Sequence, residues 1–175
     1  MLQKILLLLV LPLSVLALIG YYALGGFNSI EIDLVQTDAR VVVGQPYRGT
    51  YGDLALRKIF VEAKQRQQNG TVPGVLTVIN RDATSGSEEE VNQFIGIALT
   101  APLDSLPPDY RRDTLAAGTY LRARVSAHPL AQPRPRTINE QLVDYAAEHR
   151  LSVSGLPIEL YQASDTLWVE MAVVR

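Results

Sequence analysis

The sequence predicts an α+β protein in which an N-terminal transmembrane helix precedes a duplicated domain with an antiparallel sheet. Three observations lead to this prediction. Residues 5–24 form an apolar run of twenty residues. Two amphipathic helical segments each follow one strand and precede two more, which gives a strand–helix–strand–strand order that occurs twice. The two copies run almost in register, with residues 40–79 matching residues 123–162.

The apolar run is long enough to cross a bilayer, since a spanning helix needs about 20 apolar residues. Pro12 and Gly20 are tolerated in a lipid-embedded helix, and Tyr21 and Tyr22 occupy the far end, where an aromatic belt is expected. A cleaved signal peptide is the competing interpretation, but no clear cleavage motif precedes the domain. We therefore expect residues 1–27 to form an uncleaved signal anchor and its flank.

The charges beside the apolar run predict its orientation. Lys4 and the amino terminus are positive, whereas Glu31 and Asp33 are the first charges on the other flank. The positive-inside rule then places the N-terminus in the cytoplasm and the domain across the membrane. The prediction is a single-pass membrane protein with an extracytoplasmic domain.

Composition excludes several classes of protein. The 175 residues allow one domain with an appendage, and the formal charge of −2 does not indicate a nucleic-acid-binding surface. The absence of cysteine excludes disulfides, thiolate metal sites and a cysteine nucleophile. His128 and His149 lack the spacing of metal ligands. We therefore expect no cofactor, no metal and no nucleic-acid partner.

The first repeat is expected over about residues 30–100. Pro46 should stop its second strand, and Thr50 and Asp53 have the spacing of a capping box at the start of its helix. The acidic segment 80–90 is expected to be a solvated loop tip. The predicted elements are strands at 30–34 and 40–44, a helix opened by residues 49–53 and ending near 68, and strands at 75–79 and 91–99.

The second repeat is expected over about residues 118–175, after a proline-containing connector at 101–112. Thr137 and Glu140 form a capping box directly after the segment 132–136, which reads QPRPR. The predicted elements are a strand at 118–127, a helix that begins at this capping box and ends at about His149, and a closing hairpin. The predicted buried residues of that helix are Ile138, Leu142, Tyr145 and Ala146.

The closing hairpin carries an unusual group of side chains. If it closes around a four-residue turn at 163–166, Tyr161 pairs with Trp168, and Glu159 pairs with Glu170. Two aromatic rings and two carboxylates then share the face opposite an aliphatic one. Facing carboxylates repel each other unless a cation lies between them or one keeps a proton. A cationic aromatic ligand would supply both a counter-charge and a cation–π contact.

An internal explanation competes with the ligand. Arg122 and Arg124 project from a neighbouring strand on the same face, and they could neutralise Glu159 and Glu170. The hairpin would then be a packed structural feature. Tyr51 and Tyr120 are further candidates for the wall of a ligand site, although tyrosines at the edges of helices and strands often only pack.

Three short motifs and their order resemble the GyrI-like small-molecule-binding domain, which also forms the effector-binding half of some AraC- and MerR-type regulators. The motifs are the helix entry GTYGDL at 49–54, the strand GLPIELY at 155–161 and the closing segment WVE at 168–170. A membrane segment followed by this domain is also similar to the arrangement in the testis-expressed ER-phagy receptor family.

The resemblance implies two units related by a pseudo-twofold axis with a ligand cleft between them. It also implies a buried glutamate among aromatic rings that contacts cationic or polarised ligands. Glu170 matches that glutamate, and Glu159 and Tyr161 match the Pro-x-Glu-x-Tyr strand. The sequence carries neither a helix-turn-helix nor a tail that recruits autophagy machinery, so we expect neither of those roles.

We therefore expect a membrane-anchored module that binds a lipophilic cationic or polarised aromatic ligand without turnover. One alternative is a hydrolase of strained electrophiles, in which Glu159 raises the pKa of Glu170 and Glu170 acts as the general base. The other is a membrane-tethered adaptor that binds a protein through residues 80–90 or 132–136. The candidate ligand-binding residues are Glu170, Trp168, Tyr161, Glu159, Tyr120 and Tyr51.

Overall fold

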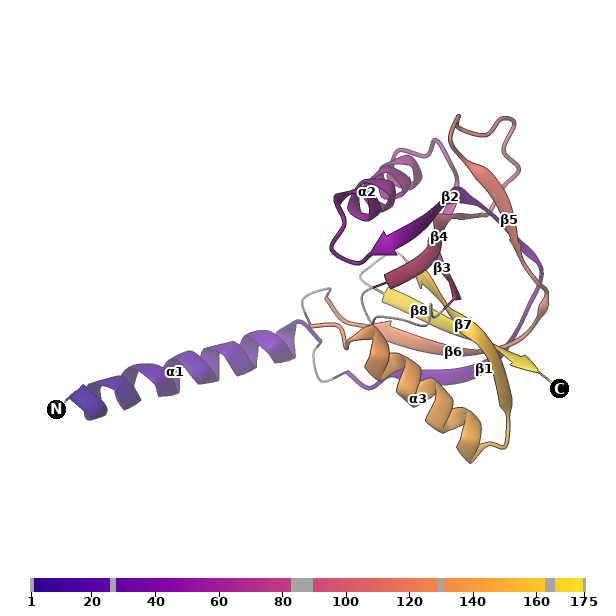
Figure 1. Ribbon diagram of the computed structural model, residues 1–175. Coiled ribbons are helices and arrows are strands. Elements are labelled where there is room, and N and C mark those ends of the chain that lie inside the picture. Colours follow the sequence, from indigo (N-terminus) through magenta and orange to yellow (C-terminus); the bar gives the residue numbers. More distant parts are fainter. Residues whose placement is uncertain (1, 26–27, 83–89, 129–130, 163–165, 175) are drawn as a thin grey trace.

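The computed structural model describes residues 2–25, 28–82, 90–128, 131–162 and 166–174. These residues form three helices and one eight-stranded antiparallel sheet, which agrees with the antiparallel α+β part of the prediction (Figure 1). The helices are α1 (Leu2–Ala23), α2 (Leu54–Gln68) and α3 (Pro135–Glu148). The strands are β1 (Glu31–Thr37), β2 (Arg40–Thr50), β3 (Gly74–Asp82), β4 (Glu90–Leu99), β5 (Arg111–Leu115), β6 (Gly118–Ser126), β7 (Ser152–Tyr161) and β8 (Thr166–Val174).

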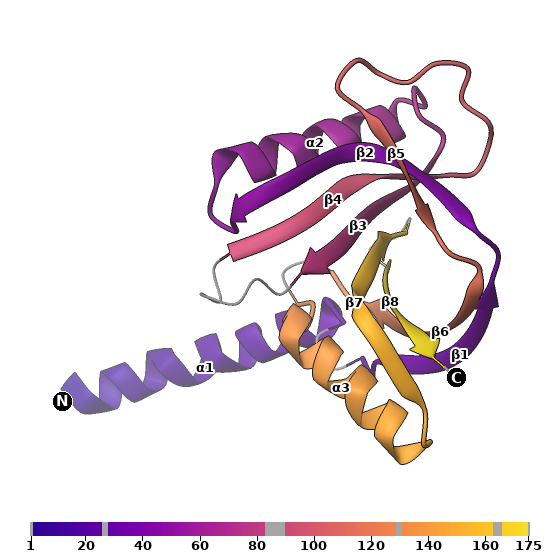
Figure 2. The same ribbon diagram turned by 45° about the vertical axis from the view of Figure 1, so that its right-hand side comes forward.

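The strand order is symmetric about the contact between β3 and β7. From that contact the sheet continues through β4, β2 and β5 to one edge, and through β8, β6 and β1 to the other. The edge strands are exchanged between the halves, because β1 precedes β2 in the chain but pairs with β6, and β5 precedes β6 but pairs with β2. Figures 1 and 2 show the two connections, at residues 38–39 and 116–117, crossing from one half to the other.

The sheet curls, so its two faces differ in what covers them. On the face that we call the inner face, apolar side chains from all eight strands meet in one cluster, which only a strongly curved sheet allows. Both α2 and α3 pack on the opposite face, which we call the helix face. The cluster on the inner face contains Val42, Ile79, Phe94, Ala98, Leu115, Tyr120, Ile158 and Leu160, with Val35, Val75, Trp168 and Ala172 against it.

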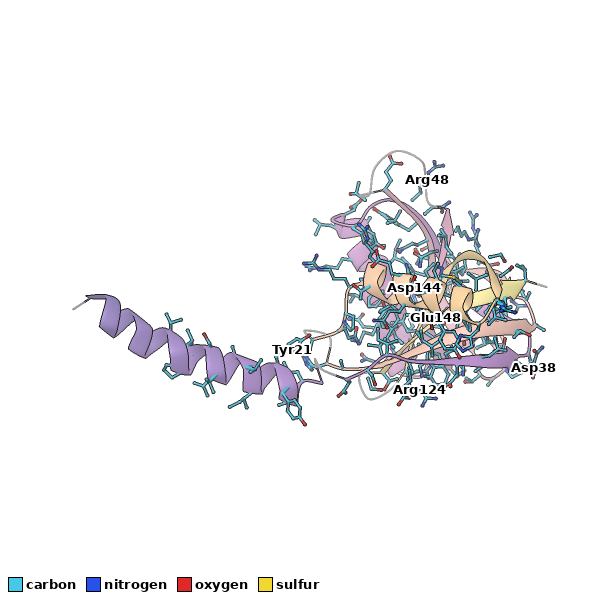
Figure 3. The ribbon with its side chains drawn as sticks, turned by 90° about the horizontal axis from the view of Figure 1, so that it is seen from below. Tyr21, Asp38, Arg48, Arg124, Asp144 and Glu148 are labelled. Carbon is cyan, nitrogen blue, oxygen red and sulfur yellow. The ribbon has the colours of Figure 1, made fainter. Side chains whose placement is uncertain are left out.

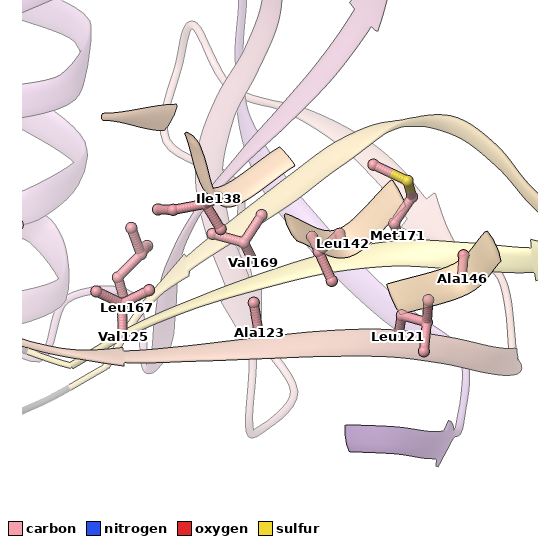
Figure 4. Close-up of a cluster of buried hydrophobic side chains, with 9 residues drawn as sticks. All are labelled: Leu121, Ala123, Val125, Ile138, Leu142, Ala146, Leu167, Val169 and Met171. Carbon is pink, nitrogen blue, oxygen red and sulfur yellow. The ribbon is translucent and has the colours of Figure 1, made fainter. Parts of the chain in front are cut away.

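The helix α3 buries the apolar stripe that its periodicity predicts. Ile138, Leu142 and Ala146 are buried against β6 and β8, and Figure 4 shows them facing the side chains of those strands. Asp144 and Glu148 lie on the exposed side of the same helix (Figure 3). Truncating a buried leucine such as Leu142 to alanine costs about 2–5 kcal/mol in comparable cores. Packing of this stripe therefore fixes the position of α3.

The helices α2 and α3 begin at residues other than those that the sequence predicted. The N-cap of α2 is Asp53 itself, whose carboxylate accepts a hydrogen bond from the Ala55 amide at 2.9 Å, so Thr50 is not the cap. Helix α3 starts at Pro135, and Thr137 therefore lies inside its first turn. Proline is favoured at the first helical position because its missing N–H would have had no helical partner there.

Two strand predictions also need correction. Strand β2 continues through Pro46 to Thr50, because beyond Gly44 it pairs with β4 alone and proline needs no partner on the open side. Strand β5 was not predicted, and it begins inside the predicted connector at 101–112. Its sequence, RRDTL, lacks the apolar alternation by which a strand is recognised. Gly44 and Gly96 face each other across β2 and β4, where a Cβ on Gly44 would lie 2.1 Å from the Ile95 carbonyl oxygen.

Helix α1 forms over the apolar run and extends away from the sheet (Figures 1 and 3). Within the described ranges, however, no helix has the span and apolar character that a bilayer crossing requires. Leu24, which the prediction counted inside the span, lies beyond the helix and joins the domain, because its carbonyl accepts a hydrogen bond from the His128 amide at 2.9 Å. The predicted transmembrane anchor over 1–27 is therefore wrong. So are the signal anchor, the single-pass location and the extracytoplasmic orientation. The membrane as a partner through this helix finds no support.

Candidate functional site

The hairpin of β7 and β8 has a different register from the predicted one. Glu159 pairs with Val169, and Tyr161 pairs with Leu167. The difference arises because Thr166 belongs to β8, where its carbonyl accepts a hydrogen bond from the Gln162 amide at 2.8 Å. The other predicted turn residues, 163–165, lie outside the described residues.

A register shift of one residue moves a side chain to the other face of a sheet. The two predicted pairs are therefore separated: Glu159 and Tyr161 lie on the helix face, whereas Trp168 and Glu170 lie on the inner face, opposite Leu160 and Ile158. The four side chains do not form one cluster, and each face must be considered by itself.

On the inner face, Glu170 is completely buried and is held by two arginines. Arg40 Nη2 lies 2.5 Å from Glu170 Oε2, and Arg122 Nη2 and Nε lie 2.6 and 2.8 Å from Oε1. The internal neutralisation that the sequence suggested is thus present for Glu170, but with a different second partner. Arg124 instead lies 3.5 Å from Glu31 of β1.

The two aromatic candidates on the inner face belong to the same ion-pair cluster. The Arg122 guanidinium lies 4.2 Å from the centroid of the Trp168 ring, and the Arg40 guanidinium lies 5.7 Å from that of Tyr120. The Tyr120 hydroxyl donates to the Ala116 carbonyl at 2.8 Å. A cation would have to displace two arginines to reach Glu170, so the ligand-binding role expected of Glu170, Trp168 and Tyr120 stays a prediction that these contacts do not favour.

On the helix face, Glu159 lies at the centre of a hydrogen-bonded network of neutral groups. Its Oε2 accepts from the Tyr161 hydroxyl at 2.7 Å, and its Oε1 lies 3.4 Å from Asn80 Nδ2. The Asn80 amide also donates to the Pro157 carbonyl at 2.9 Å and accepts from Gln93 Nε2 at 2.8 Å. These bonds fix the Asn80 amide in the orientation that presents its N–H groups to Glu159.

The network joins the two halves of the sheet. Glu159 and Tyr161 come from β7 of the second half, whereas Asn80 and Gln93 come from β3 and β4 of the first. In the antiparallel contact at the symmetry axis, Val78 pairs with Glu159, and Leu76 pairs with Tyr161. The first half therefore places aliphatic side chains where the second places a carboxylate and a phenol, and the site is asymmetric.

The titration of the tyrosines reflects this environment. Burial, followed by the charge of Glu159 and the hydrogen bond to it, raises the pKa of the Tyr161 hydroxyl far above its usual range. The pKa of Tyr51 is also raised, first by burial of its hydroxyl and then by Glu159, although 58% of the residue's surface is exposed. Tyr161 therefore stays protonated and donates to Glu159 throughout the physiological range.

A cleft between α2 and α3 exposes this network, and it has two chambers that share Pro135, Glu159 and Tyr161. The chamber beside α3 has a volume of about 310 Å³ and the chamber beside α2 about 320 Å³. The α3 chamber is also lined by Gln132, Pro133, Arg134, Ile138, Asn139, Leu167 and Val169. The α2 chamber is also lined by Tyr51, Leu56, Arg57, Phe60, Val78, Gln93 and Ile95.

A wide groove along α3 adjoins the cleft. It shares Tyr51, Arg134, Pro135 and Asn139 with the two chambers and continues over Glu140 and Val143 on the exposed side of the helix. The groove gives a solvent route to the chambers. The segment 132–136, expected to be a loop before the helix, thus lines the mouth of the cleft and starts α3.

The negatively and positively charged side chains around the cleft differ in their burial. None of the ion pairs found among the described residues includes Glu159, which is half-buried and accepts hydrogen bonds only from neutral groups. Arg57 and Arg134 line the two chambers, but both side chains lie on exposed positions at the rim. Over the described part of the chain, no cluster of histidine, aspartate and glutamate could hold a metal ion.

Of the six predicted site residues, the structure brings Glu159, Tyr161 and Tyr51 together in the cleft and places Glu170, Trp168 and Tyr120 on the inner face. Sequence reasoning missed other residues of the cleft, above all Gln93 and Phe60, and also Asn80, which hydrogen-bonds to Glu159. Phe60 packs edge-on against Tyr161 with ring centroids 5.3 Å apart. Its helical periodicity marked it as buried, but no local signal distinguishes a core phenylalanine from one in a cleft wall.

Comparisons with known proteins bear on the fold. No family model matches the chain, and no curated protein matches it. Among solved structures, the chain is similar to EcmrR in its DNA complex, with a TM-score of 0.60, 11% identity and coverage of 99% of this chain and 69% of that one. It is also similar to the EcmrR C-terminal domain, with a TM-score of 0.57, 13% identity and coverage of 83% and 98%.

A third similar structure is that of SAV2435 bound to tetraphenylphosphonium, with a TM-score of 0.52 and 18% identity over 82% of this chain and 94% of that one. The DNA in the EcmrR complex and the tetraphenylphosphonium bound to SAV2435 are ligands of those proteins. Sequence identities this low establish a similar fold alone. The similarity to an ER-phagy receptor finds no support among these structures. The chain has the GyrI-like fold that its sequence resembles.

Proposed function

We propose that this protein binds a small lipophilic cation in the cleft between α2 and α3, with Glu159 as the counter-charge. One observation carries the proposal. Glu159 is a half-buried carboxylate in the wall of both chambers, and it has no cationic partner among the described residues. A partly desolvated carboxylate without a counter-ion is costly, and a bound cation would remove that cost.

The lining of the cleft favours a cation that is also apolar. The rings of Tyr51, Phe60 and Tyr161 stand around the α2 chamber, and aliphatic and proline side chains line much of the α3 chamber. A cation against an aromatic face gains about 0.5–2 kcal/mol, with the larger values in desolvated sites. Each chamber falls at the lower end of the volume range of small-molecule sites, which is about 300–1,000 Å³.

The solved structures support this proposal by analogy. SAV2435 was solved with tetraphenylphosphonium, a lipophilic cation, and its fold is similar to that of this chain. We extend the ligand class to this protein because Glu159 and its aromatic neighbours provide the chemistry that such a cation needs.

We propose binding without turnover. The hydrolase alternative required Glu170 as a general base, but both of its oxygens are engaged by arginines and it lies on the face opposite the cleft. The adaptor alternative relied on residues 80–90, of which 83–89 lie outside the described residues, and on residues 132–136, which line the cleft. No specific observation in the described residues favours either alternative.

Calorimetric titration of the full chain with tetraphenylphosphonium tests the proposal. Glu159→Gln removes the charge and keeps the shape, and it should weaken binding by at least about tenfold, which corresponds to about 1.4 kcal/mol. Glu140→Gln is the matched control, because Glu140 lies outside both chambers and pairs with Arg136 on the surface of α3. Equal affinity of the wild type and Glu159→Gln would refute Glu159 as the counter-charge.

A neutral ligand of related shape completes the test. Triphenylphosphine oxide should bind the wild type more weakly than tetraphenylphosphonium, and Glu159→Gln should remove most of that preference. A wild type that prefers the neutral compound would overturn the proposal that the site selects cations.

A further inference from the structure

The cleft is divided into two chambers by a partition of shared residues. This division restricts the shape of a ligand that could fill both chambers. Glu159 and Tyr161 belong to the walls of both chambers, and a 2.7 Å hydrogen bond joins their side chains. Pro135, the first residue of α3, is the third shared residue. Among the residues that the structure describes, the Glu159 carboxylate at the boundary is thus the only charged group common to both chambers.

Each chamber can hold an apolar group by itself. An apolar cavity of about 150 Å³ is known to accept benzene, and the two chambers measure about 310 and 320 Å³. Their linings differ in kind. Phe60 and Tyr51 give the α2 chamber an aromatic character, whereas Ile138, Leu167 and Val169 give the α3 chamber an aliphatic floor.

We propose that the ligand is a two-armed cation, with its positive centre at Glu159 and one apolar arm in each chamber. This inference rests on the proposed function and adds the class of ligand to it. A ligand with a single arm could use only one chamber at a time, because the charge must remain at the partition to reach Glu159. A compact cation with two arms satisfies the carboxylate and fills both chambers together.

The positions of the charged groups agree with a central positive charge. Glu159 is at the boundary, whereas Arg57 belongs to the α2 chamber alone and Arg134 to the α3 chamber alone. A cation at the far end of either arm would approach an arginine and lose affinity through like-charge repulsion. The charge is therefore best placed in the middle of the ligand and the apolar groups at its ends.

Two ammonium ions that differ by one arm test the inference. The full chain is titrated with benzyltrimethylammonium, which has one aromatic arm, and with dibenzyldimethylammonium, which has two. The two-armed ion should bind at least about tenfold more tightly, since a second buried ring adds the burial of a further apolar group.

Two chamber-filling variants separate specific occupancy from a general gain in hydrophobicity. Leu56→Trp should fill the α2 chamber, and Asn139→Trp should fill the α3 chamber, because each residue lines one chamber only. Each variant should reduce the affinity of the two-armed ion to near that of the one-armed ion. Neither should change the affinity of the one-armed ion by more than about twofold to threefold, since the other chamber stays open. Unchanged thermal unfolding confirms that both variants fold.

The outcomes distinguish the two proposals. If both ions bind equally well and both lose affinity in Glu159→Gln, the counter-charge is correct and the two-armed ligand is wrong. Filling either chamber without effect on the two-armed ion would also overturn the inference. If neither ion depends on Glu159, the proposed function itself fails.

Discussion

Glu159 and Glu170 lie on neighbouring strands of one hairpin, yet their surroundings differ completely. Glu170 is fully buried on the inner face and is neutralised by Arg40 and Arg122. Glu159 is half-buried on the helix face and, within the described ranges, receives hydrogen bonds only from Tyr161 and Asn80. The first carboxylate belongs to a buried ion-pair cluster, and the second has the neutral surroundings on which the proposed cation site depends.

The difference comes from distant parts of the chain. Arg40 reaches Glu170 from the start of β2, 130 positions away in sequence, and Arg122 reaches it from the adjacent strand β6. On the helix face, the adjacent strand β3 supplies the amide of Asn80, and β4, one strand further, supplies that of Gln93. The role of a carboxylate in this sheet is thus decided by its cross-strand neighbours and not by its local sequence.

The largest expected effect concerns the stability of the inner face. Glu170→Gln leaves two largely buried arginines without their counter-charge, and breaking a buried ion pair in this way costs about 3–5 kcal/mol. Denaturant unfolding measures the loss. Glu159→Gln should change the unfolding free energy by less than about 1 kcal/mol, because its partners are neutral.

The surface pair of Glu140 and Arg136 provides a matched control, since both side chains are more than half exposed. Glu140→Gln should cost less than about 1 kcal/mol. If Glu170→Gln were no more destabilising than Glu140→Gln, the contrast between the two faces would be lost.

The second prediction converts the neutral surroundings of Glu159 into charged ones. Asn80→Asp has nearly the same shape but places a second carboxylate beside Glu159, and two neighbouring carboxylates hold a shared proton more readily than one. The other titratable or charged groups around Glu159 are Tyr161 on β7, Tyr51 before α2, and the rim residues Arg57 and Arg134. As pH falls, this pair of carboxylates in the variant therefore takes up a proton, and the bound cation loses part of its counter-charge.

The affinity for tetraphenylphosphonium in Asn80→Asp should therefore fall by about tenfold more than in the wild type between pH 8 and pH 5. Asn80→Ala removes the same hydrogen bond without adding charge and should show no such steepening. Parallel pH profiles for the wild type and Asn80→Asp would argue against an ionised Glu159 as the recognition group.

The third prediction uses the hydroxyl of Tyr161, whose pKa is raised by burial and by Glu159. A raised pKa in the folded state means that this group contributes stability below the tyrosine pKa of the unfolded chain, about 10, and loses it as pH rises further. Above about pH 10 the wild type should therefore lose stability faster than Tyr161→Phe, by up to about 1.4 kcal/mol per pH unit. Unfolding curves between pH 9 and pH 11 measure the difference, and coincident slopes would contradict it.

The smallest effect is expected at the rim. Arg57 lines the α2 chamber from an exposed position, where its repulsion of a bound cation is screened by solvent. Arg57→Gln should strengthen tetraphenylphosphonium binding by about twofold to threefold, and added salt should remove the gain. A loss of affinity would indicate that Arg57 contacts the ligand favourably.

Much of the fold could be predicted from periodicity. The stripe of Ile138, Leu142 and Ala146 identified the buried side of α3, and alternation identified β6, β7 and β8. Strand β5 could not be found in this way, because its polar residues lie at an edge of the sheet and only Leu115 is buried. Alternation detects strands that bury one face, so it misses an edge strand of this kind.

The candidate site was harder to predict because its faces depend on the length of one turn. Assigning Thr166 to the turn and not to β8 placed Glu159 beside Glu170, and every later inference about the hairpin followed from that choice. The prediction that arginine could neutralise a glutamate holds for Arg122 and Glu170, since the residues pair directly across β6 and β8. No local sequence pattern indicated Arg40 as a partner of Glu170. The two residues meet only because β1 and β2 lie in opposite halves of the sheet.

The exchanged edge strands have a consequence for how the protein folds. Strand β1 must wait for β6, so the half that contains β6, β7 and β8 cannot complete its sheet from one continuous segment. The other half runs continuously from β2 to β5, but its edge strand β5 comes from the segment that follows the first repeat. Contacts between such distant segments close large loops, which slows folding and makes it cooperative. A fragment that ends after β4 would keep β1 without a partner and would expose an unprotected sheet edge. The repeat is visible in the sequence, but the unit that folds is the whole domain.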